Sequence, residues 1–81
     1  MRLEEYLLST SDIVQDVIAQ VLEDDEITLD ASLWDDLMVD PSERIEIALA
    51  LEAEFGIVLT ADTIGSWVTV QDIVDSVQQE G

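Results

Sequence analysis

The clearest structural signal in this sequence is the run Asp-Pro-Ser-Glu at residues 40–43. An Asp side chain caps the free amides of a first helical turn, proline suits the first helical position, and a Glu three residues after the cap completes a box-like pattern. A helix is therefore predicted to begin here, to run through Phe55 and to end at Gly56. Its apolar residues spread around more than half of the circumference, so Ile45 and Leu49 are expected to form an uncovered apolar strip.

Two more segments place apolar residues at the three- and four-residue spacing of an amphipathic helix. In one, the apolar stripe covers residues 13–22, behind hydroxyl residues at 9–11 that can cap a first turn. In the other, it covers residues 70–77. Residues 60–64 could add one helical turn, and no segment shows a strand pattern. The predicted fold class is all-α, a small four-helix bundle with three longer helices and one short third helix.

A chain of 81 residues is long enough for one small domain. Residues 1–10 are interpreted as an N-terminal extension, either a short helix or a lead-in, and residues 11–81 as the single helical domain. Residues 23–36 are predicted to form a long loop, because Asp, Ser and Thr favour turns. Its apolar side chains are expected to hold it against the body, and both tryptophans are interpreted as packing residues rather than ligand contacts. The apolar residues expected to hold the loop are Ile27, Leu29, Leu33, Trp34 and Leu37. The second tryptophan is Trp67.

The charge balance limits the kinds of partner. Twenty acidic residues stand against 2 basic ones, which gives a net charge of −18. Phosphate contacts need clustered Lys and Arg, so neither nucleic acid nor an anionic membrane surface is an expected partner. With 48% apolar residues the chain is expected to fold. No signal peptide is recognisable and no apolar run reaches the roughly 20 residues of a membrane span, so the predicted location is the cytoplasm.

The sequence offers little for catalysis or metal binding. Without Cys or His it lacks thiolate ligands, disulfides and the commonest general base. The acidic clusters at 24–26 and 35–36 lack the glycine that an EF-hand loop needs at its sixth position, so a dedicated calcium site is the weakest of the hypotheses. No catalytic residue and no metal ligand is predicted, and the protein is not expected to be an enzyme.

The order and spacing of several segments between residues 11 and 77 resemble the acyl carrier protein family. The matching segments are 30–37 (DASLWDDL), 40–55 (DPSERIEIALALEAEF), 56–59 (GIVL) and 69–74 (TVQDIV). The resemblance implies the helical bundle of that family and a setting in fatty acid or polyketide biosynthesis. It also implies enzyme partners such as a synthase, an acyltransferase or a ligase.

The family's working part is an Asp-Ser-Leu triplet whose serine carries 4′-phosphopantetheine, and here that register reads Asp40-Pro41-Ser42. Pro41 has no hydroxyl, so no cofactor is expected there, and Met38 replaces the family's glycine. In one interpretation the protein keeps the fold without the arm and works by binding. In the alternative it is a functional carrier whose thioester-linked acyl groups sit on 4′-phosphopantetheine at Ser42. That hydroxyl lies about 100° around and about 1.5 Å along the helix from the usual position, a displacement to which in-line transfer is sensitive.

The acidic face of the predicted second long helix resembles the surface on which family members dock to basic patches. We call it the docking surface; it comprises Asp40, Glu43, Ile45, Glu46, Leu49 and Glu52. Opposite charge raises encounter rates and selects partners, and salt screens it. The leading hypothesis is therefore a monomeric acidic module that docks on a basic-surfaced enzyme. Arg44, the lone cation of this face, is expected to pair with a neighbouring glutamate or to mark a contact that differs from those of other family members.

Overall fold

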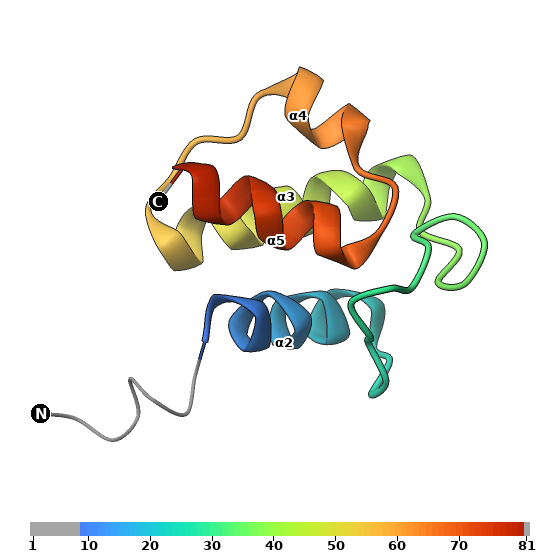
Figure 1. Cartoon of the computed structure of the whole chain (residues 1–81). Coiled ribbons are helices and arrows are strands. Elements are labelled where there is room, and N and C mark those ends of the chain that lie inside the picture. The colour runs from blue at the N-terminus through green and yellow to red at the C-terminus, as the bar shows by residue number, and fades with distance from the viewer. Residues whose placement is uncertain (1–8, 81) are drawn as a thin grey trace, which may run out of the picture.

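Four α-helices account for most of residues 9–80, the part of the chain that the computed structural model describes. In chain order they are α2 (Thr10–Leu22), α3 (Pro41–Phe55), α4 (Ala61–Ser66) and α5 (Val70–Glu80). The predicted class, an all-α bundle with three longer helices and one short one, is confirmed. Helix α2 packs against both α3 and α5, and α4 lies on the side of α3 and α5 that faces away from α2 (Figure 1). The expected extension at residues 1–10 lies almost wholly outside the described residues.

The ends of α3 lie where the local sequence signals place them. The Glu43 amide donates to Asp40 Oδ1 at 2.8 Å, and the Asp40 amide donates to Glu43 Oε1 at 3.1 Å. These reciprocal bonds satisfy amides that have no partner inside the helix. At the other end Gly56 takes the left-handed conformation, with φ of 66°, and its amide returns to the Glu52 carbonyl. Helix α2 has the same type of N-terminal box, formed by Ser9 and Asp12.

The core lies between α2, α3 and α5 and is entirely apolar among the described residues. Burying each Val, Leu or Ile side chain of this core contributes about 1.5–3 kcal/mol relative to leaving it in water. The helices contribute most of the buried side chains, and the connecting segments contribute six. The buried residues are Val14, Val17, Ile18, Ile27, Ala31, Leu33, Val39, Ile47, Ala48, Leu51, Leu59, Trp67, Val70, Ile73, Val74 and Val77.

The long loop between α2 and α3 is tied to the start of α5 by backbone hydrogen bonds. The Leu33 amide donates to the Val68 carbonyl at 2.9 Å, and the Val70 amide donates to the Ala31 carbonyl at 3.1 Å. Ala31 and Leu33 both face the core, and Ile27 is buried as well. The loop is therefore held by the inward side chains and by this short stretch of pairing.

The two tryptophans have opposite environments, which corrects one expectation. Trp34 is 71% exposed instead of holding the loop against the body. Leu33 is buried and its amide pairs with the Val68 carbonyl, whereas Trp34 lies in the turn at residues 33–36 and faces solvent. Trp67 is buried as expected, and its indole nitrogen donates to Ser76 Oγ at 2.9 Å. Within residues 9–80, no helix combines the length and the apolar character needed to cross a bilayer.

Candidate functional site

The start of α3 holds the two residues that decide whether a pantetheine group can be attached in the way the family resemblance implies. Pro41 and Ser42 are the first two residues of the helix, and both are exposed. A phosphodiester to pantetheine requires a side-chain oxygen. Pro41 does not fit that group, because its ring carries no heteroatom beyond the backbone nitrogen. Ser42 does offer a hydroxyl, displaced by one residue along the helix.

Just before this helix start, Met38 has a φ of 54° in the left-handed region. Glycine visits this region freely, whereas a side chain there costs roughly 1–2 kcal/mol. The resemblance aligns Met38 with a family glycine, so the backbone here has a glycine-type conformation without the glycine. The Met38 side chain is 78% exposed and lies beside the start of α3.

The six residues of the docking surface divide into two groups. Ile45 and Leu49 are 55% and 59% exposed, so the expected uncovered apolar strip is present, and Glu46 beside it is exposed too. Asp40 and Glu43 are engaged in the capping box described above. Glu52 is half-buried, and its Oε2 accepts from the Leu59 amide at 2.7 Å.

Arg44 has a different role from the expected pairing with a neighbouring glutamate. Its Nη1 donates to the Ile64 carbonyl at 2.8 Å and to the Trp67 carbonyl at 3.0 Å. These carbonyls lie at the C-terminal end of α4, where helix carbonyls lack internal partners and a cation is favoured. None of the six residues of α4 is buried. Arg44 therefore fastens a helix that has little packing of its own.

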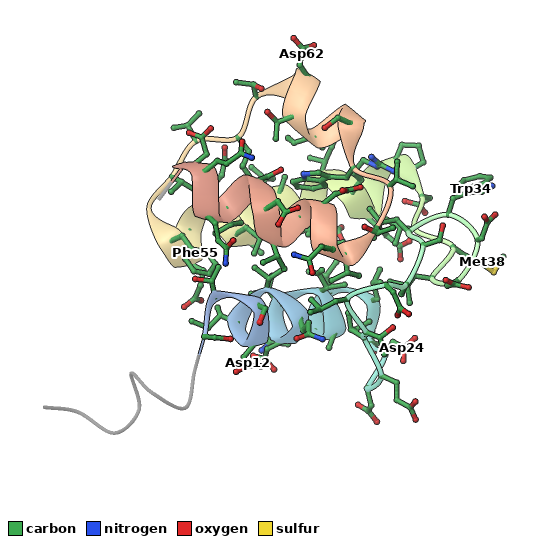
Figure 2. All side chains as sticks on the ribbon, viewed as in Figure 1. Asp12, Asp24, Trp34, Met38, Phe55 and Asp62 are labelled. Carbon is green, nitrogen blue, oxygen red and sulfur yellow. The ribbon has the colours of Figure 1, made fainter. Side chains whose placement is uncertain are left out.

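An apolar groove opens between the start of α3, helix α4 and the preceding loop. We call it the Trp34 groove; it has a volume of about 470 Å³. Its lining residues are Trp34, Val39, Pro41, Arg44, Ile45, Ala61, Ile64 and Gly65. A smaller hollow of about 340 Å³ lies along the loop between Trp34 and Met38. Figure 2 shows both side chains projecting from the same end of the molecule.

The sequence does not predict this groove, because its pattern favours Trp34 as a packing residue. The exposure of Trp34 is set by a contact between distant segments, because the Leu33 amide pairs with the Val68 carbonyl and Trp34 lies in the turn at residues 33–36 that follows. A partial signal in the sequence is the spacing of two residues of α3. Pro41 and Ile45 then reach the same side of α3, since they are four residues apart.

The acidic loop does not assemble a metal site. An open depression of about 850 Å³ is bordered by residues 22–26, 28, 30, 31, 36 and 37. Nevertheless, across residues 9–80, no group of three or more acidic side chains converges so that it could hold a metal ion.

Comparison with known proteins agrees with this arrangement. A family model described as "Phosphopantetheine attachment site" matches residues 12–77. An acyl carrier protein from Petrotoga mobilis is 30% identical over 80 residues, which cover 99% of this chain and 92% of that protein. An acyl carrier protein from Exiguobacterium sibiricum is 39% identical over 69 residues, covering 83% and 87% of the two chains.

A solved structure extends the agreement to three dimensions. It comes from Mycobacterium tuberculosis, is assigned as an acyl carrier protein, and superposes with a TM-score of 0.84 at 28% identity. The match covers 88% of this chain and 97% of that one. The chain therefore belongs to the acyl carrier protein family, whose members are carriers and not enzymes.

Proposed function

We propose that this protein is an acyl carrier family member without the usual attachment serine, and that it acts as an acidic docking partner of a biosynthetic enzyme. The observation that supports the proposal is the exposed Pro41 ring at the first position of α3. The register of the resemblance puts this ring where the family carries its hydroxyl. The helix start is capped by Asp40 and Glu43, so its structure needs no serine at that point.

The docking part of the proposal depends on charge and on the exposed strip of α3. Ile45 and Leu49 supply apolar contact, and Glu46 lies exposed between them in sequence. With a net charge of −18, the protein attracts a basic surface and repels a second copy of itself. We therefore infer a monomer whose partner is a basic-surfaced synthase, acyltransferase or ligase in the cytoplasm.

The alternative function is that of a loaded carrier with 4′-phosphopantetheine on Ser42. The exposed hydroxyl in the first turn of α3 favours this alternative. Its displacement by about 100° and about 1.5 Å from the first helical position opposes it, because transfer from coenzyme A requires an aligned oxygen. The two functions differ in one measurable property, which is covalent loading.

The deciding experiment is the intact mass of the full chain after incubation with coenzyme A and a broad-specificity phosphopantetheinyl transferase. The proposal expects no mass gain for the wild-type protein and a full gain of one arm for Pro41→Ser. That pair of results would locate the defect at the missing hydroxyl alone. A gain in the wild-type protein that disappears in Ser42→Ala would instead establish the loaded carrier and overturn the armless function.

A further inference from the structure

We propose that the Trp34 groove receives an apolar side chain from a basic segment of the partner protein, with Trp34 as the main contact. This inference rests on the docking function proposed above and adds to it a socket beside the docking surface, with which it shares Ile45, as well as the chemistry of the residue that enters it. The site has three walls, formed by the loop before α3, the first turns of α3, and α4.

The groove is a built feature. Val39 at its base is buried, and the Pro41 ring is fixed by the capped start of α3. The opposite wall, α4, is held by the hydrogen bonds from Arg44 to the Ile64 and Trp67 carbonyls. These bonds direct Nη1 of the guanidinium toward the backbone of the wall.

The dimensions suit a large side chain with its flanking backbone. A volume of about 470 Å³ falls inside the range of about 300–1,000 Å³ typical of ligand pockets. Trp34 is 71% exposed, and tryptophan is among the residues that most often dominate binding free energy when an interface covers them. An exposed tryptophan beside an apolar hollow therefore has area available for burial by a partner.

The charges around the groove identify the occupant. Exposed Asp35 and Asp40 line the smaller hollow on the other side of Trp34. A negatively charged ligand, or a second copy of a chain with a charge of −18, would meet repulsion here. A segment that carries both lysine or arginine and a large apolar residue satisfies the acidic rim and the apolar floor together.

The test uses two synthetic peptides of equal positive charge and the ¹⁵N-labelled full chain at low ionic strength. One peptide is an amphipathic leucine–lysine helix, and the other has every leucine replaced by alanine. The leucine peptide is expected to shift the resonances of the Trp34 indole and of the Ile64 and Gly65 amides, and to bind at least about tenfold more tightly than the alanine peptide.

Matched variants separate the socket from general charge attraction. Trp34→Ala is expected to weaken binding of the leucine peptide by at least about tenfold. Val58→Ala, which alters a side chain that is 74% exposed and outside the groove, is expected to change it by less than about twofold. Since both side chains face solvent, neither variant should unfold the protein, and the amide spectrum verifies this.

The remaining outcomes are decisive. Equal binding of the two peptides, or equal effects of the two variants, would overturn the socket and leave charge-driven docking intact. Resonance shifts confined to Glu46 and Leu49 would likewise overturn the socket and leave charge-driven docking intact. If neither peptide binds, both the socket and the docking function fail.

Discussion

Arg44 Nη1 lies 2.8 Å from the carbonyl oxygen of Ile64, so a single side chain of α3 caps the C-terminal end of α4. Replacing it by methionine keeps an unbranched aliphatic stem and removes both hydrogen bonds. Hydrogen bonds from charged groups contribute about 1.5–3 kcal/mol each when well enclosed, and since Arg44 is partly exposed, a total loss of about 1–2 kcal/mol is expected.

The informative measurement for Arg44→Met is amide hydrogen exchange, helix by helix. Exchange should accelerate in α4 far more than in α2 or α5, because α4 has no buried residue to hold it. Arg44→Lys provides the control, since it keeps the positive charge but replaces the planar guanidinium group by an ammonium group. Uniform acceleration across all helices would show that Arg44 supports the whole bundle instead.

The capping box at the start of α3 makes a second prediction about stability. Asp40→Ala removes the acceptor for the Glu43 amide and should lower the free energy of unfolding by about 1 kcal/mol. Ser42→Ala, two residues on and exposed, should change it by less than about 0.5 kcal/mol. Urea denaturation of both variants measures the difference. A loss in Ser42→Ala as large as that in Asp40→Ala would mean that the serine has a structural role.

The left-handed backbone at Met38 predicts a stabilising substitution. Met38→Gly should raise the free energy of unfolding by about 1 kcal/mol, because the strain of a side chain at positive φ is relieved. Because the Met38 side chain is exposed, removing it loses little packing. Val68→Gly, at an exposed residue whose φ is not positive, should instead be destabilising. Thermal unfolding of both variants checks the prediction, and a lower melting temperature for Met38→Gly would contradict it.

The charges of the docking surface predict the rate at which an enzyme engages the protein. In the Pro41→Ser background, loading by the phosphopantetheinyl transferase provides the readout. Adding Glu46→Lys should slow loading by about three- to tenfold at low salt, and the difference should shrink as salt is raised. Asp75→Lys makes the same change of charge at an exposed position of α5 and should have a much smaller effect. Equal slowing in the two variants would indicate that total charge, and not the α3 surface, governs the encounter.

The parts of this fold that the sequence predicted are those set by local chemistry. The limits of α3 followed from Asp40, Pro41 and Gly56, whose preferences act within one helical turn. The exposure of Ile45 and Leu49 followed from helical periodicity, because too many apolar residues surround α3 for one buried face.

The parts that the sequence did not predict depend on contacts between distant segments. Arg44 was expected to pair with a neighbouring glutamate or to mark a contact that differs from those of other family members, and it reaches carbonyls twenty or more residues away. The exposure of Trp34 depends on the pairing of Leu33 with Val68, which no local pattern encodes. The groove is the joint result of these two contacts, and therefore only the folded chain reveals it.

Because Trp34 is exposed and Trp67 is buried, the two indoles are intrinsic fluorescence reporters of different events. A neutral quencher such as acrylamide should reach the exposed indole and spare the enclosed one. Loss of tertiary structure then changes the emission of Trp67, whereas occupation of the groove changes that of Trp34. Unfolding and binding can therefore be followed in the same unlabelled sample, with Trp34→Phe as the variant that isolates the folding signal.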